Sequence, residues 1–209
     1  MNGEVVKKLS VISKSVGVLL AASSVFLLSS CSSVDAAATV GKDSISVKTI
    51  EESVQAILKA RAATDTTNKQ LATGNKLSQD VVRFHLISLL LTDVAIKYKA
   101  IPTDAQIASR RAAIVKTVGG ESALPDALVG ASIAPQDFDA YVKTILISEN
   151  LGKIAQAAGV DNTGGAAIQA LVVGVADKQG VKVNPRYGTW DAASANIVDK
   201  LPNTAVQTK

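Results

Sequence analysis

The sequence predicts a mainly α-helical protein with a small β-sheet that joins strands from the two ends of its folded part. Apolar residues recur every three or four positions over most of residues 47–180, which is the spacing of one helix face. Short alternating segments stand on either side of this region, at residues 38–46 and 181–184. We expect these two segments to pair, with Val40 and Val183 facing the helices.

The helices are placed by their apolar spacing and by capping residues. Ser46 and Thr103 are expected N-caps, Pro135 suits a first helical turn, and Gly130 is expected to end a short helix. The helix after residue 78 is apolar on much of its circumference, so we expect it to be central and buried. The expected helices cover residues 47–62, 79–99, 104–118, 121–128, 135–158 and 166–180.

The N-terminal segment has the composition of an export signal. Three lysines precede an apolar run over residues 16–28, which is shorter than the roughly 20 residues of a membrane span. The run closes in Leu-Ser-Ser-Cys, which resembles the lipobox of bacterial lipoproteins and ends at the lone cysteine, Cys31. That resemblance implies a signal peptide over residues 1–30, acylation of the Cys31 thiol, and a lipid anchor on the extracytoplasmic face of the cell membrane.

Two alternatives to the lipoprotein interpretation remain open: an uncleaved anchor helix, or ordinary cleavage near residues 36–38. We favour the lipoprotein because an exported protein with one cysteine otherwise leaves a free thiol. The expected organisation is then a lipidated tether over residues 31–36 and one helical domain over residues 37–191. Residues 192–209 contain few large apolar side chains, so we expect a disordered tail there.

Composition argues against several classes of function. The formal charge is +4, acids and bases are interspersed, and aromatic residues make up only 3% of the chain. Nucleic-acid sites need basic patches and stacking rings, so we expect no nucleic-acid partner. The pair Gly164–Gly165 is isolated, and Glu51 and Glu52 point to different helix faces. We therefore expect no cofactor, no metal and no small-molecule substrate.

His85 is the sole histidine and lies beside the apolar face of its helix. One interpretation is a general base or a pH-sensitive contact. We favour the other, a histidine at the edge of the core with one hydrogen bond. Asp137 and Asp139 are interpreted as helix-start residues, and no Gly-x-Ser-x-Gly motif is present. No catalytic residue is therefore assigned, and we expect a protein that is not an enzyme.

The order of these segments resembles the N-terminal chaperone domain of the SurA and PrsA foldases. The resemblance covers residues 37–191 and is carried by the expected hairpin, the apolar helix around residues 86–91, and the helix start Ile-Ala-Pro-Gln-Asp-Phe at residues 133–138. The closing segment Val-Asn-Pro-Arg-Tyr-Gly-Thr-Trp-Asp, residues 183–191, carries it furthest. It implies a non-catalytic holdase for unfolded or partly folded exported polypeptides.

One departure from that family concerns catalysis. Many of its members carry a parvulin prolyl-isomerase domain of roughly 90 residues. The resemblance implies that such a domain would be inserted between the last two expected helices. Those helices are separated by the short segment 159–165. We therefore expect no prolyl-isomerase activity.

Two sets of residues complete the expectations. A client-binding surface is expected on apolar stripes of the first and middle helices, because a small core does not bury them all. Its candidates are Ile50, Val54, Ile57, Leu124, Leu128, Phe138 and Tyr141. Trp190, Tyr187 and Pro185 are expected to be structural, with an aromatic contact to clients as the alternative for the two rings. The alternative function is an adaptor lipoprotein with one envelope partner.

Overall fold

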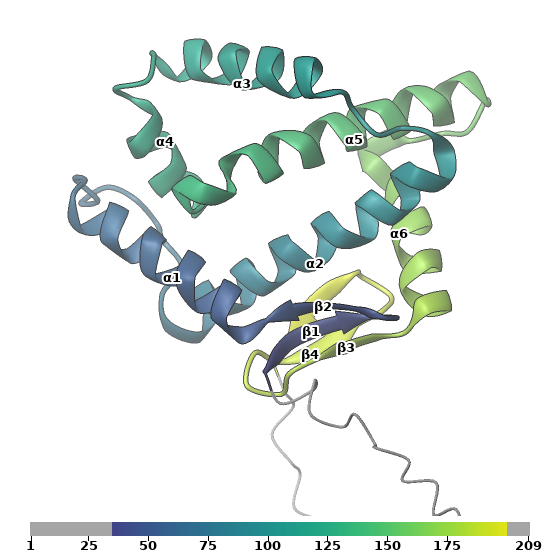
Figure 1. Ribbon diagram of the computed structural model, residues 1–209, viewed down its shortest axis with the longest axis horizontal. Coiled ribbons are helices and arrows are strands. Elements are labelled where there is room, and N and C mark those ends of the chain that lie inside the picture. The colour runs from purple at the N-terminus through teal and green to yellow at the C-terminus, as the bar shows by residue number, and fades with distance from the viewer. Residues whose placement is uncertain (1–34, 200–209) are drawn as a thin grey trace, which may run out of the picture. The chain divides into compact units, whose positions relative to one another are not determined.

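The computed structural model describes residues 35–199 (Figure 1). The predicted signal peptide, the predicted acylation site Cys31 and the last ten residues of the predicted tail lie outside the described residues. The described part is mainly helical with a small antiparallel sheet, as expected. Its α-helices are α1 (Val47–Ala62), α2 (Gly74–Tyr98), α3 (Asp104–Val118), α4 (Leu124–Ala131), α5 (Phe138–Ala157) and α6 (Ala166–Gln179). Two short 3₁₀ helices are η2 (Pro135–Asp137) and η3 (Thr163–Gly165).

The main sheet joins strands from the two ends of the described chain. β1 (Ala36–Val40) lies in the centre, between β2 (Asp43–Ser46) and β3 (Val181–Val183), and both pairings are antiparallel. Val40 is fully buried, and Val183 packs against the same core. The predicted pairing and the inward orientation of both valines are confirmed. Because β2 and β3 are outer strands, each has one edge without a neighbouring strand in this sheet.

The chain remains ordered beyond the end predicted for the domain. β4 (Thr189–Asp191) pairs with β5 (Asn196–Val198), and Ile197 is buried against the main core. Gly188 has a φ of +123°, and a side chain there would collide with the carbonyl oxygen of Val198. The predicted disorder is therefore wrong for residues 192–199, because one buried isoleucine and a close backbone approach order this segment.

The opposite boundary of the domain also moves. Ala36 was assigned to the tether, but it belongs to β1 and is buried. A single alanine leaves no apolar pattern in the sequence that marks it as a strand residue. The domain therefore begins before residue 37.

The helix boundaries follow the predicted caps at two positions. The Ser46 hydroxyl accepts a 3.0 Å hydrogen bond from the Thr49 amide, and Thr103 forms a capping box with Gln106. α2 begins five residues earlier than predicted, since the turn after Gly74 contributes the buried Leu77. Gly130 lies inside α4 instead of ending it, and the left-handed residue there is Ser132.

Apolar side chains form two separate clusters. The main core joins the sheet to α1, α2, α6 and the C-terminal half of α5. A smaller set, the distal cluster, lies among α3, α4 and the start of α5 and consists of Val115, Leu124, Leu128, Phe138 and Val142. In Figure 1, α3 and α4 lie on the side of α5 that faces away from the sheet. Among residues 35–199, no helix combines the length and apolar character needed to span a bilayer.

Candidate functional site

Most of the predicted client-binding residues are core residues. Ile50 and Ile57 are buried in the main core, while Leu124, Leu128 and Phe138 make up most of the distal cluster. The half-buried pair, Val54 and Tyr141, packs against one cluster each. The prediction of an exposed surface is therefore wrong for the five buried side chains. It assumed one small core, whereas the fold buries the stripes in two.

The three predicted structural residues lie near the second sheet. Trp190 packs against the main core from β4, which supports its structural role. Tyr187 is 3% exposed, and its hydroxyl has no hydrogen-bond partner within the described residues. Burial is the main reason that the pKa of Tyr187 is raised, and the nearby Arg186 opposes that rise. Pro185 is exposed and lies two residues after the end of β3.

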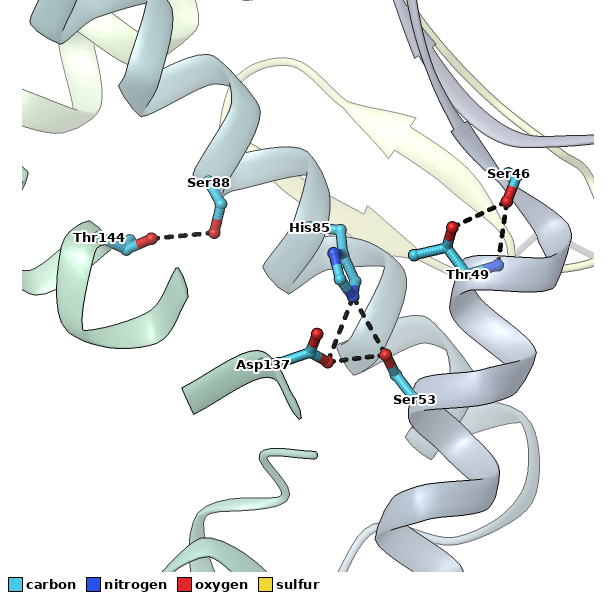
Figure 2. Close-up of polar contacts among 7 residues, drawn as sticks. All are labelled: Ser46, Thr49, Ser53, His85, Ser88, Asp137 and Thr144. Carbon is cyan, nitrogen blue, oxygen red and sulfur yellow. Dashed lines mark hydrogen bonds and ion pairs between the residues drawn. The ribbon is translucent and has the colours of Figure 1, made fainter. Parts of the chain in front are cut away.

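A polar cluster joins three elements beside the main core (Figure 2). Ser53 of α1 donates a 2.7 Å hydrogen bond to Oδ2 of Asp137, which ends η2. Nε2 of His85, on α2, lies 3.4 Å from that carboxylate oxygen and 3.4 Å from the Ser53 hydroxyl. Ser53 itself is only 2% exposed. His85 therefore lies at the edge of the core, as expected, but has two polar neighbours rather than one.

The electrostatics of this cluster centre on Asp137. Burial on its own raises the pKa of this carboxyl group. Hydrogen bonds from His85 and Ser53, together with the charge of His85, lower the pKa by more than burial raises it. The net effect is a pKa below the ordinary value. The carboxylate is therefore held in its charged form and ties η2 to α1 and α2.

These three residue types also occur in hydrolase triads, but their arrangement here is different. A triad needs the carboxylate on one imidazole nitrogen and the serine on the other, so that the histidine removes the serine proton. Here Asp137 and Ser53 approach the same nitrogen of His85, and the Ser53 hydroxyl donates its hydrogen bond to Asp137 instead of to His85. Ser53 is also buried away from any substrate. The geometry fits a structural clasp between helices.

An open groove of about 600 Å³ lies next to this clasp. It is bounded by β2, the first turn of α1, the middle of α2 and the first half of α5. Its lining is mostly neutral, with six hydroxyl groups and three aliphatic side chains. The lining residues are Asp43, Ser44, Ile45, Ser46, Thr49, His85, Ser88, Leu89, Thr92, Ala140, Lys143 and Thr144.

Two threonine hydroxyls on the α2 and α5 walls direct their protons to their own helices and not into the groove. Thr92 and Thr144 donate to carbonyl oxygens of their own helices, those of Ser88 and Ala140. The Ser88 and Thr144 hydroxyl oxygens lie 3.0 Å apart, which links the two helices (Figure 2). Each hydroxyl oxygen keeps lone-pair capacity beyond these bonds. This wall of the groove can therefore accept hydrogen bonds from a bound molecule.

Charge at the groove is sparse. Asp43 and Lys143 lie on different walls, and neither forms an ion pair within residues 35–199. No cluster of histidine, cysteine, aspartate and glutamate suited to a metal ion occurs in the part of the chain that the structure describes. The groove suits a neutral, hydrogen-bonding ligand.

Comparisons of this chain with protein-family models, curated proteins and solved structures found no match.

Sequence reasoning missed both the clasp and the groove. Ser53, His85 and Asp137 come from three elements, and no local spacing links them. Ser88 and Thr144 interrupt apolar helix patterns as isolated hydroxyls, which alone predicts solvent contact. The alternation after residue 42 was an available signal, because it predicts a short hairpin whose outer strand has an edge without a partner.

Proposed function

We propose that this protein is a non-catalytic holdase that binds unfolded or partly folded polypeptide segments in the groove beside β2. The observation that carries the proposal is the lining of that groove, in which neutral hydroxyls and aliphatic side chains surround about 600 Å³ of space. Volumes of this size are typical of ligand sites. A lining without a reactive constellation suits binding rather than chemistry.

The proposal moves the client site away from the stripes expected from sequence. Those stripes are occupied by the two clusters, so clients that bind the folded protein need another surface. The groove supplies aliphatic contacts from Ile45, Leu89 and Ala140 together with hydrogen-bond acceptors. A mixed lining of this kind tolerates varied neutral sequences, which a holdase requires.

We also propose that the protein works at the extracytoplasmic face of a membrane, held by an acylated Cys31. The support is the N-terminal sequence pattern described above. Mass spectrometry of the membrane fraction is expected to find an acylated N-terminal cysteine, and Cys31→Ser is expected to abolish that modification. A Cys31→Ser protein that is still cleaved and membrane-bound contradicts the proposal.

The direct test of holdase function is light scattering from a denatured client that is diluted into buffer with the full chain. We expect the full chain, in a mild non-ionic detergent, to suppress aggregation at low and at high salt, because salt weakens apolar contacts far less than charge contacts. Detergent alone is the control. If the protein at several-fold molar excess does not suppress the aggregation of any of three unrelated clients, the holdase function is contradicted.

A second candidate function is an adaptor that binds one defined envelope partner. The polar clasp favours it, because a rigid link between α1, α2 and η2 presents one fixed surface. Pull-down from envelope extracts distinguishes the two functions: an adaptor yields one stoichiometric partner, and a holdase yields many weak ones. Only a holdase is expected to suppress the aggregation of unrelated clients.

A further inference from the structure

The groove follows one edge of the main sheet. All four residues of β2, Asp43–Ser46, line it, and β2 is the outer strand next to β1. An outer strand presents main-chain N–H and C=O groups that no neighbouring strand uses, and another extended chain can pair with them. The groove therefore combines a strand edge with space beside it.

The register shows which main-chain groups of β2 point away from β1 and remain at the outer edge of the sheet. Val40 and Asp43 are opposite each other across a two-residue turn, so they form the first hydrogen-bonded pair of the hairpin. Ser44 is opposite Thr39 in the next, non-bonded pair, and its N–H and C=O therefore point away from β1. The register shifts between Ala36 and Ala38, but the alternation on the β2 side persists beyond this irregularity, because the Val47 amide donates a 2.7 Å hydrogen bond to the carbonyl oxygen of Asp35.

The main-chain N–H and C=O groups of odd-numbered residues in this segment thus point toward β1, and those of even-numbered residues point away from it. Three main-chain groups remain at the outer edge: the N–H and C=O of Ser44 and the N–H of Ser46. The C=O of Ser46 is excluded, because an N-cap carbonyl accepts the first hydrogen bond of its helix.

The opposite wall offers a second set of acceptors. Ser88 and Thr92 on α2 and Thr144 on α5 line the groove, and Thr92 and Thr144 donate their protons to their own helices. A strand has N–H groups on both of its edges. A polypeptide lying in the groove can therefore pair with β2 along one edge and donate to hydroxyl oxygens along the other.

We propose that client polypeptides bind by adding a strand to the β2 edge, with neutral side chains directed into the groove. This inference rests on the proposed holdase function and names its binding mode. Because main-chain groups make the contacts, binding depends on an extended backbone and a neutral side-chain pattern rather than on one sequence. Folded proteins, whose backbone groups are already paired, are not bound.

The first test needs no variant of the protein. The probe is a labelled peptide of alternating valine and threonine, about eight residues long, with blocked ends. We expect the full chain to bind it and the Ser44 and Ser46 amides to exchange hydrogen more slowly when it is bound. Two further peptides carry N-methyl groups on every second residue, one on the odd-numbered and one on the even-numbered residues. One of these two phases removes the donors that face β2, and its affinity is expected to fall by about tenfold. Equal binding of the unmodified peptide and both methylated phases overturns the proposal.

The second test is a matched pair of variants at the exposed Ser44. Ser44→Pro removes an N–H that β1 does not use, and proline is tolerated at such edge positions. We expect it to lower peptide affinity by about tenfold, whereas Ser44→Ala keeps the N–H and binds normally. Thermal unfolding shows whether each variant is folded. If Ser44→Pro does not fold, the methylated peptides decide the question.

The outcomes separate the binding mode from the function. Aggregation suppression that survives in folded Ser44→Pro, with unchanged peptide binding, overturns strand addition and leaves the holdase function standing. A chain that neither binds the peptide nor suppresses aggregation overturns both. Exchange protection of Ser44 that rises with protein concentration, without peptide, identifies a second copy of this chain as the occupant and overturns the proposal.

Discussion

The main core and the distal cluster are built from similar aliphatic residues but differ in how they are held. The main core brings together a sheet and four helices, and side chains such as Leu86, Leu90 and Val94 are fully buried. The distal cluster has only five buried residues, four of which retain 3–8% exposure. Fewer buried contacts mean a lower local stability, so we expect the distal helices to open before the main core.

Several polar contacts link the two regions. Ser53 reaches Asp137, Arg61 donates a 2.9 Å hydrogen bond to Ser132, and Lys69 lies 2.8 Å from a carboxylate oxygen of Asp126. The main apolar connection is α5 itself, whose first half belongs to the distal cluster and whose second half belongs to the main core. Hydrogen bonds can exchange with water at small net cost, so this boundary is a natural place for separation.

The largest expected effect is a cavity in the main core. Leu86→Ala is expected to lower the free energy of unfolding by about 2–5 kcal/mol, because Leu86 is fully buried at the centre of α2. Urea denaturation measures the loss. Leu58→Ala is the control, since Leu58 is 42% exposed and should change stability by less than about 0.5 kcal/mol. Equal losses in both variants would contradict the assigned core.

A cavity in the distal cluster should act locally. Phe138→Ala is expected to lower global stability by about 1–2 kcal/mol, less than a fully coupled phenylalanine loses, because the distal helices can detach on their own. Hydrogen exchange should accelerate in α3 and α4 while α2 stays protected. Uniform acceleration in all helices would show that the two regions unfold as one unit.

The clasp should make part of the stability pH-dependent. The pKa of Asp137 is lowered in the folded state, so its contribution is fully present above the ordinary pKa of about 3.9 and is lost as pH falls through the lowered value. Asp137→Asn is expected to cost about 1 kcal/mol at neutral pH. Urea denaturation at a series of pH values should show the two proteins converging in acid. A difference that still grows as the pH falls below about 3.9 would contradict this assignment.

The smallest effect is expected at the exposed ion pair. Lys69→Ala should cost less than about 0.5 kcal/mol, because the Asp126 side chain is 58% exposed and water screens the pair. Thermal unfolding at low and high salt should show that this small loss shrinks with salt. A loss larger than that of Asp137→Asn would mean that surface charge, rather than the clasp, joins the two regions.

Local rules predicted the parts of the fold that depend on neighbours in sequence. α3 has the predicted bounds, since Thr103 caps its start and Gly119 takes the left-handed conformation at its end. The β1–β3 pairing was also predicted, because two alternating segments have few other partners in a helical chain. Gly130 misled the prediction, because a glycine inside a helix lowers stability but does not have to end it.

The features that were missed depend on contacts between distant segments. Ile197 and Gly188 order β5 through packing and a close backbone approach, and neither leaves a pattern in its own segment. The same holds for the clasp, where Ser53 meets Asp137 only after α1, α2 and η2 have packed together. The groove is a further step away, because it is the space left between elements rather than a property of one of them.

The central position of β1 sets an order of events during synthesis. β1 is the first described strand to be made, and its partner β3 is made only after all six α-helices. Until Val181–Val183 emerges, one edge of β1 lacks its partner, and the buried Val40 has only part of its surroundings. Closing this sheet brings together very distant residues, which slows folding. A chain interrupted before β3 is therefore left with an open central strand, so closure of this sheet waits for residues made after all six described α-helices.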